Sequence, residues 1–173
     1  MKIAVIISDG TEELEVLTPV DILRRANVEC DLISVCDKIT SGSHNVKIVA
    51  DKLLTEVDLS SCDGIIIPGG MPGASIISEK QPIISAVKKF LSENKLVASI
   101  CASPAIVLAK NHLIDGRKAT CYPAKDFIKL MENTTYTCLN VQVDGNLITA
   151  NGPRSALEFS MCICDFLGVK PNF

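Results

Sequence analysis

The residue with the clearest potential for chemistry is Cys101, which follows the aliphatic run 96–100 and precedes a predicted helix. Small residues, Ser99 and Ser103, lie two positions before and two positions after it. A nucleophile elbow needs small side chains there, because the turn from strand to helix is sharp. At such a turn, the helix dipole and free N–H groups favour a thiolate, and the N–H of Ala102 is a natural oxyanion donor. The alternative is a core cysteine followed by small packing residues.

Three carboxylates lie just after the first aliphatic run, residues 3–7. Glu12 and Glu13 fall in the first turn of a predicted helix, where they stabilise the macrodipole and need no other function. Glu15 lies between apolar neighbours, so its carboxylate could be partly buried. A buried carboxylate has a raised pKa and could share a proton with a thiolate. The residues alone support the structural and the catalytic interpretation of Glu15 equally.

A glycine pair, Gly69 and Gly70, follows another buried run at residues 63–68. Glycine lets the backbone approach a neighbouring group closely, so this turn offers a second N–H donor. Taken alone, a Pro-Gly-Gly sequence is usually only a turn.

The chain has only two histidines, and neither is placed for a Cys-His-acid triad. His112 lies beyond the predicted helix after Cys101, roughly 15 Å along its axis. His44 precedes the predicted strand 46–49 and could reach the site only through the fold or a dimer. We therefore expect no conventional triad.

Short aliphatic runs alternate with helical patterns along the chain, which predicts a mostly parallel sheet with helices on both faces. Ligands collect at the carboxyl ends of strands in such sheets, where the candidate residues fall. Pro19 is expected to kink the first helix or mark a restart, and the predicted hairpin has a type I′ turn at residues 144–145. We expect one domain over residues 1–173. Predicted strands are 2–8, 28–35, 46–49, 63–68 and 96–100, with the hairpin at 141–149; predicted helices are 12–27, 82–94, 104–110 and 154–167.

The composition is that of an ordinary globular protein, with 47% hydrophobic residues, 21% charged residues and a net charge of −3. It gives no reason to expect nucleic acid or a membrane as partner, and with no targeting segment visible we expect a cytoplasmic protein. The eight cysteines contain no CxxC pair, so we expect seven of them to be structural free thiols and no metal site. Neither a GxGxxG motif nor a P-loop is present, so no cofactor is predicted.

Several segments together resemble the ThiJ/PfpI superfamily, in the branch of the Parkinson-disease-linked deglycase (DJ-one) and its bacterial relatives. They run in order along nearly the whole chain. The segments are Gly-Thr-Glu-Glu-Leu-Glu at 10–15, Pro-Val-Asp-Ile-Leu-Arg-Arg at 19–25, Pro-Gly-Gly at 68–70, Ala-Ser-Ile-Cys-Ala-Ser-Pro at 98–104, Pro-Ala-Lys-Asp at 123–126 and Asn-Gly-Pro at 151–153.

This resemblance implies a flavodoxin-like three-layer α/β sandwich with a nucleophile elbow, as in class I amidotransferases, and a homodimer. It makes Cys101 the reactive, oxidisable cysteine and Glu15 a protonated acid hydrogen-bonded to it. Gly70 and Ala102 would supply backbone donors to an oxyanion or a cysteine sulfinate.

Four further residues are candidates for lining the site or contacting a dimer partner: Glu12, His44, Tyr122 and Pro153. Tyr122 stands where some relatives have a histidine near the nucleophile. His44 falls where several relatives carry an arginine that reaches across the dimer, so a contact there would depend on pH. The protease-like branch and class I glutamine amidotransferases are disfavoured, because this chain has Ala102 after the nucleophile and no late histidine.

Two functions follow from the resemblance. One is a cofactor-independent glyoxalase or deglycase, in which Cys101 attacks a small reactive carbonyl such as methylglyoxal, glyoxal or an early glycation adduct. The other is a non-enzymatic oxidative-stress sensor or redox-regulated chaperone, in which Cys101 stops at sulfinic acid. A third interpretation is a small-molecule binding module with a vestigial cysteine.

Overall fold

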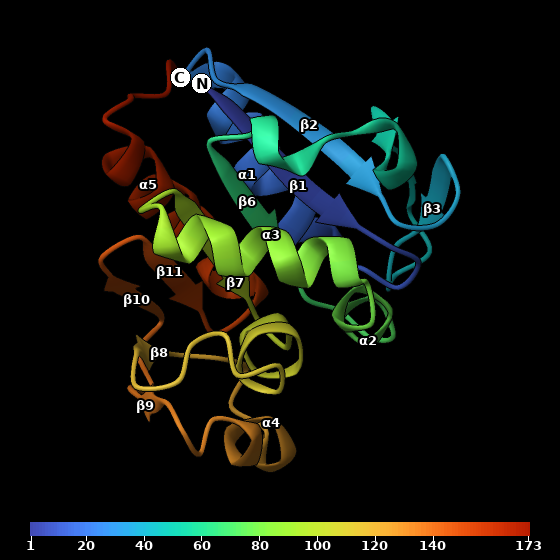
Figure 1. The fold of residues 1–173 in the computed structure, drawn as a ribbon. Coiled ribbons are helices and arrows are strands. Elements are labelled where there is room, and N and C mark those ends of the chain that lie inside the picture. The colour runs from blue at the N-terminus through green and yellow to red at the C-terminus, as the bar shows by residue number, and fades with distance from the viewer.

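A seven-stranded sheet forms the middle of the computed structural model, which describes residues 1–173 (Figure 1). The strand order is β10-β11-β7-β6-β1-β2-β5, and every pair is parallel except the β10–β11 hairpin. The strands are β1 (Lys2–Ile7), β2 (Glu29–Ser34), β5 (Lys52–Leu53), β6 (Gly64–Ile67), β7 (Leu96–Ile100), β10 (Val141–Asp144) and β11 (Leu147–Ala150).

Helices cover both faces of this sheet, which explains why its central strands are continuous aliphatic runs. Ile3 and Val5 of β1 belong to the core on one face, with α1 (Glu13–Arg25) and α5 (Ala156–Leu167). Ala4 and Ile6, which point the other way, pack into the core with α3 (Gln81–Ser92). The predicted α/β sandwich, mostly parallel with helices on both faces, is confirmed.

Smaller elements lie outside the sheet. The predicted strand 46–49 is part of a separate hairpin, β3 (Ile39–Ser41) with β4 (Lys47–Val49). A short parallel pair, β8 (Lys118–Ala119) with β9 (Thr135–Tyr136), lies near α4 (Lys125–Leu130). α2 (Gly73–Ser78) follows β6, and 3-10 turns occupy Leu54–Glu56, Leu59–Ser61 and Pro153–Ser155.

The structure corrects two local expectations, the helix type at 104–110 and the hairpin turn, and excludes one of the two alternatives at Pro19. The segment Pro104–Ala109 is π-helical, with Lys110 donating to the carbonyl of Ala105 five residues earlier. α1 continues past Pro19 as one helix, so there is no restart. In the β10–β11 turn only Gly145 has a positive φ, of 58°, whereas a type I′ turn needs two such residues.

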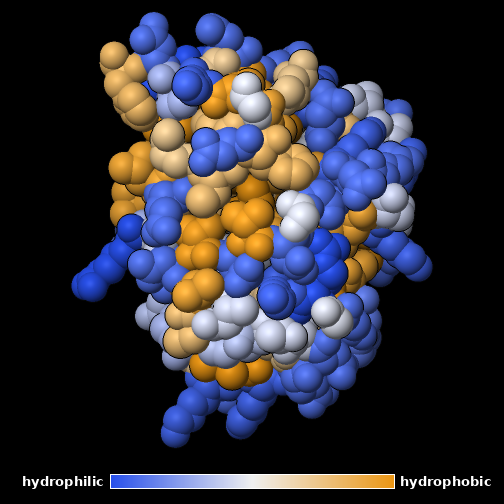
Figure 2. All heavy atoms as spheres, turned by 90° about the vertical axis from the view of Figure 1, so that its left-hand side faces the viewer, coloured by the Kyte–Doolittle hydropathy of each residue, from blue (hydrophilic) through white to orange (hydrophobic).

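The surface carries scattered apolar side chains, several of them on the outer elements. Figure 2 looks onto the side that holds α5 and the β10–β11 hairpin, and apolar side chains gather across part of it. The large exposed apolar residues on these elements are Val143, Leu157 and Phe166. None of the helices combines the length and the hydropathy that crossing a bilayer would require.

Candidate active site

Cys101 occupies a sharp turn at the carboxyl end of β7. Its φ is +64°, a left-handed conformation that costs a residue with a Cβ about 1–2 kcal/mol. Backbone hydrogen bonds hold it on both sides: its N–H donates to the carbonyl of Ala150 (2.9 Å), and its own carbonyl accepts the N–H of Tyr122 (2.7 Å). This is the geometry of a nucleophile elbow.

The small residues that flank Cys101 are completely buried, which explains why their size matters. Ser103 donates its hydroxyl to the carbonyl of Pro68 (2.6 Å) and so ties the turn to the end of β6. The Ser99 hydroxyl is buried without a hydrogen-bond partner. Larger side chains at either position would displace the neighbouring strand ends.

Glu15 is completely buried, so its carboxyl group lies inside the protein, and its catalytic role stays a prediction. Its Oε2 accepts the N–H of Gly69 (2.8 Å), while its Oε1 has no hydrogen-bond partner. A Cβ on Gly69 would lie 2.6 Å from the Cβ of Cys101 and 2.8 Å from Oε2 of Glu15. Gly69 therefore lies against both groups, a contact that the Pro-Gly-Gly sequence signalled without identifying which glycine makes it.

The ionisations of Glu15 and Cys101 oppose each other. Burial raises the pKa of Glu15 to about 7, against the Gly69 hydrogen bond that lowers it, and the charge of Glu12 raises it further. Burial and then the Glu15 carboxylate raise the pKa of the Cys101 thiol, contrary to the expected thiolate at a helix N-terminus. Because two like charges so close are unfavourable, the pair carries one negative charge at most near neutral pH.

Two backbone N–H groups face the sulfur, those of Ala102 and Gly70, and both lower the pKa of Cys101. Position 70 requires glycine: its φ is +89°, and a Cβ there would lie 2.3 Å from the carbonyl oxygen of Gly10. The predicted donors are thus brought to Cys101, and their action on an oxyanion stays a prediction.

Glu12 caps the helix that carries Glu15. Its Oε2 accepts the N–H of Glu15 (2.9 Å), the side-chain bond expected of an N-cap residue. Its Oε1 lies 3.9 Å from Nδ1 of His44. Glu12 therefore adds charge beside the site and fixes the start of α1.

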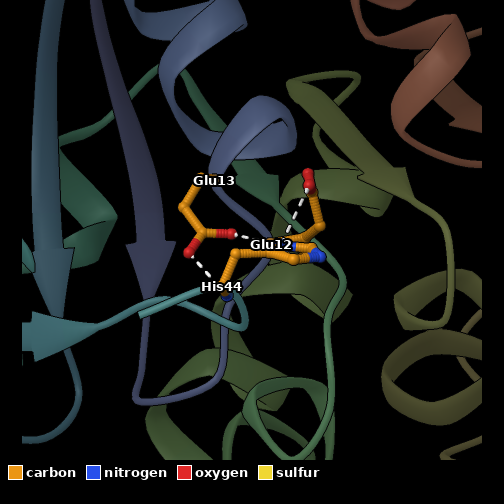
Figure 3. Close-up of side chains that lie close together, drawn as sticks. All are labelled: Glu12, Glu13 and His44. Carbon is orange, nitrogen blue, oxygen red and sulfur yellow. Dashed lines mark hydrogen bonds and ion pairs between the residues drawn. The ribbon is translucent and has the colours of Figure 1, made fainter. Parts of the chain in front are cut away.

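His44 is held by Glu13 of its own chain, as Figure 3 shows. Its Nδ1 lies 2.9 Å from Oε2 of Glu13, and its backbone N–H donates to Oε1 at 2.7 Å. The Glu13 hydrogen bond raises the pKa of His44. Burial alone would raise the pKa of Glu13, but the hydrogen bonds from His44 and Val46 outweigh it and lower that pKa to about 2. The expected contact of His44 across a dimer stays a prediction.

Glu12, Glu13 and His44 bring their ligand-type atoms within 4.8 Å of one another, a spacing that could hold a metal ion. Both Glu13 oxygens, however, already accept hydrogen bonds from Ser43, His44 and Val46. Hydrogen bonding and the ion pair with His44 account for this cluster without a metal.

Tyr122 and Pro153 line a cavity of about 350 Å³ beside the elbow. Cys101 is not among its walls, but the backbone of Tyr122 is bonded to the Cys101 carbonyl. Sequence reasoning missed Arg154, a cation in this wall whose only signal was its place after the Asn-Gly-Pro segment. The full lining is Tyr122, Pro123, Asn151, Gly152, Pro153 and Arg154.

A second, larger cavity of about 470 Å³ lies between residues 54–60 and α3. None of the candidate residues lines it. The residues predicted from the sequence therefore lie at the elbow and not at this larger cavity.

Comparison with known proteins finds relatives, several of whose names place them in one group, the DJ-1 proteins. "Protein DJ-1 homolog B" of Arabidopsis thaliana is 37% identical over 165 residues, which are 95% of this chain but 37% of that protein. The chain thus spans well under half the length of this plant relative. "Glutathione-independent glyoxalase DJR-1.2" of Caenorhabditis elegans is 33% identical over 92% of this chain and 84% of that protein.

The solved structure described as "Toxoplasma gondii DJ-1, oxidized" superposes with a TM-score of 0.90 at 36% identity, covering 96% of this chain and 90% of that one. The profile described as the DJ-1/PfpI family matches residues 1–165. The chain therefore belongs to the DJ-1/PfpI family.

Proposed function

We propose that this protein is a cysteine-dependent glyoxalase that needs no cofactor and converts methylglyoxal to lactate or glyoxal to glycolate. The observation that carries the proposal is the pairing of Cys101, on a strained elbow, with the completely buried Glu15. The two side chains are hydrogen-bonded to each other, and burial raises the pKa of Glu15 to about 7. A carboxyl group in that position can take the thiol proton and return it to a bound substrate.

In the first step the Cys101 sulfur attacks the aldehyde carbon of methylglyoxal. A carbon–sulfur bond forms, the aldehyde oxygen gains a proton, and the product is a hemithioacetal. The Glu15 carboxylate takes up the thiol proton and passes it to the aldehyde oxygen, so that Glu15 is a carboxylate again once the hemithioacetal has formed. The N–H groups of Gly70 and Ala102 stabilise the oxygen while it carries charge.

The second step moves a proton between the two substrate carbons. The Glu15 carboxylate removes the proton from the former aldehyde carbon, which gives an enediolate. The hydroxyl proton on that carbon passes to the former ketone oxygen, and Glu15 returns its proton to the neighbouring carbon, which leaves a thioester on Cys101 and a hydroxyl group on the neighbouring carbon. Water then hydrolyses the thioester, releasing lactate and the thiol. A carboxyl group whose pKa is about 7 suits both directions of transfer at neutral pH.

The relative from Caenorhabditis elegans named a glutathione-independent glyoxalase supports the choice of substrate class. Repair of early glycation adducts begins with the same attack by sulfur on a carbonyl carbon. We therefore extend the proposal to such adducts as alternative substrates of the same site.

The second candidate is an oxidative-stress sensor or redox-regulated chaperone. It is favoured by the partial exposure of Cys101 and by the two N–H groups that face its sulfur. These donors, together with a protonated Glu15, could hold the oxygens of a sulfinic acid and stop oxidation at that level.

The experiment is methylglyoxal consumption with lactate detection, in the absence of glutathione, for wild type, Cys101→Ala and Glu15→Gln. We expect both variants to lose at least a hundredfold in kcat/KM, because each removes a group that touches the substrate. Cys162→Ala, a change at another partly exposed cysteine, is the matched control and should retain activity. A wild type without turnover, whose Cys101 is still selectively oxidised by peroxide, would replace the glyoxalase with the sensor.

A further inference from the structure

Two cysteines, Cys121 and Cys138, follow the two strands of the short parallel pair β8–β9. Its register pairs Lys118 with Thr135 and Ala119 with Tyr136. Cys121 and Cys138 each follow the last residue of their strand by two positions, so both thiols lie just past the same end of the pair. The structure thus joins two thiols that lie far apart in the sequence and that no CxxC spacing reveals.

Hydrogen bonds on both sides of Cys138 show that the two segments stay together beyond the strands. The N–H of Thr137 donates to the carbonyl of Ala119 (3.0 Å), and the hydroxyl of Thr120 donates to the carbonyl of Leu139 (2.8 Å). Neighbouring strands lie about 4.8 Å apart. A disulfide needs Cα atoms roughly 4.4–6.8 Å apart, a separation that two segments joined by these hydrogen bonds can reach.

The two thiols have different environments but affect each other. Cys138 is exposed and has a φ of +57°, which turns the chain out of β9, whereas Cys121 is completely buried. Burial raises the pKa of Cys121 to about 12, and the nearby Cys138 contributes. Burial and then Cys138 likewise raise the pKa of the Tyr136 hydroxyl to about 12. Cys138 therefore faces the same small space as Cys121 and Tyr136.

We propose that Cys121 and Cys138 form a second redox site, a dithiol that hydrogen peroxide converts into an intrachain disulfide closing the loop that contains α4. This site is separate from the Cys101 thiol, and it does not depend on glyoxalase activity.

Because Cys138 is exposed and Cys121 is buried, peroxide reacts first with Cys138, and Cys121 reacts in the second step. The sulfur of Cys138 attacks peroxide: an S–O bond forms, the O–O bond breaks, and hydroxide leaves with the thiol proton as water. The sulfur of Cys121 then attacks the sulfenic sulfur of Cys138. The S–S bond forms, the S–O bond breaks, and the hydroxyl leaves with the Cys121 proton as a second water. Two electrons pass from the two thiols to one peroxide.

The position of this site connects it to the elbow through the backbone. Cys121 immediately precedes Tyr122, whose N–H is bonded to the carbonyl of Cys101. Tyr122 also lines the 350 Å³ cavity. A disulfide at Cys121 would therefore fix the segment that forms one wall of that cavity.

Peptide mapping tests the proposal directly, because Lys125 and Lys129 lie between the two cysteines. The full chain carrying Cys101→Ala is treated with hydrogen peroxide, alkylated under denaturing conditions and digested with trypsin without reduction. We expect peptides 119–125 and 130–154 joined as one species, two hydrogens lighter than their sum, at least tenfold more abundant than in untreated protein. The species should disappear after reduction.

Two controls make the outcome decisive. Cys138→Ser changes an exposed position and should abolish the linked species while Cys121 remains alkylatable, whereas Cys162→Ser should leave the linked species unchanged. A mixture of unlabelled and ¹⁵N-labelled protein distinguishes a bond within one chain from a bond between two chains. Recovery of Cys138 as free thiol, as sulfinic acid or in a mixed-label peptide, with no 121–138 link within one chain, would overturn the proposal.

Discussion

At the scale of single residues, the site depends on a proton shared between Glu15 and Cys101. Glu15 is buried and Cys101 is partly exposed; the Glu15 carboxylate raises the pKa of the Cys101 thiol, whereas the hydrogen bond from Cys101 lowers the pKa of Glu15. Lone ionisable groups in a core are usually neutralised, but two adjacent groups of different chemistry can hold one charge that moves between them. Reactivity of the thiol should therefore follow the state of the carboxyl group more closely than any property of the cysteine alone.

Replacing Glu15 by Gln should stabilise the protein at high pH. The pKa of Glu15 is raised from 4.5 to about 7 on folding, so the folded state binds this proton more tightly than the unfolded state. Its contribution to stability is full below pH 4.5 and is lost as pH rises towards 7. We expect Glu15→Gln to match wild type at pH 4 and to exceed it by about 3 kcal/mol at pH 8, measured by urea unfolding at both values. A constant difference between the two proteins across this range would contradict a buried, proton-binding Glu15.

The close contact of Gly69 with Cys101 and Glu15 gives a second prediction. Gly69→Ala should lower the free energy of unfolding by about 1–3 kcal/mol and reduce methylglyoxal turnover, since the new methyl overlaps Cys101 and Glu15. Gly116→Ala is the matched control. It also strains the backbone, at φ +75°, but its Cβ meets nothing within 4 Å. Thermal unfolding and kinetics of both variants check this, and equal loss of activity in the two would show that close packing at position 69 is unimportant.

At the scale of elements, Glu12 at the start of α1 influences the pKa of Glu15 in the first turn of the same helix. Glu12→Gln keeps an oxygen for the capping bond to the Glu15 N–H but removes the charge that raises the pKa of Glu15. We expect the rising limb of the pH profile of kcat/KM to move to lower pH, because Glu15 then ionises more easily. Glu29→Gln, an exposed change in β2, should leave the profile in place. A Glu12→Gln profile that coincides with wild type would separate the capping residue from the chemistry.

The long helices and strands of the sheet could be predicted from the sequence, whereas the short elements could not. The strand 96–100 agrees in full because an aliphatic run closed by a turn has one simple interpretation. The π-helix at 104–109 is apolar throughout, so its sequence carries no periodicity that distinguishes it from an α-helix. Two-residue strands such as β8 and β9 have no period at all. The proximity of the segments that hold Cys121 and Cys138 could therefore not be predicted. Of the seven cysteines expected to be structural, Cys138 is exposed and Cys36 and Cys162 are partly exposed, and their structural role stays a prediction.

The positions of the candidate site were predictable where the local backbone admits only a few residue types, as at sharp turns and close contacts. The small residues around Cys101 predicted the sharp turn that the structure has there. The glycine pair after a strand predicted the close approach of the backbone to a neighbouring group. The direction of the Cys101 pKa was wrong, because burial and the neighbouring carboxylate outweigh the N–H groups that the elbow provides. That balance depends on distances between segments remote in sequence. The catalytic roles, like the single domain over 1–173, stay predictions.

At the scale of the whole molecule, the homodimer implied by the family resemblance is testable on the outer helices. Leu14 of α1 is 58% exposed and Leu157 of α5 is 55% exposed, although α1 and α5 belong to one packed layer. We expect a dimer in sedimentation equilibrium, and a monomer after Leu14→Glu combined with Leu157→Glu, because a buried unpaired charge opposes association. Leu139→Glu, a change at another exposed leucine, should remain dimeric. A monomeric wild type would contradict the prediction.

The hydrogen bond from the Cys101 N–H to the Ala150 carbonyl has a consequence for the newly made chain. β7 receives β11 as its parallel neighbour, so the elbow is braced by a strand translated after it. At roughly 5–20 residues per second, the ribosome needs on the order of several seconds to pass from Cys101 to Ala150. A nascent chain therefore carries an ordinary cysteine during synthesis and acquires its assembled site only when the C-terminal strands arrive.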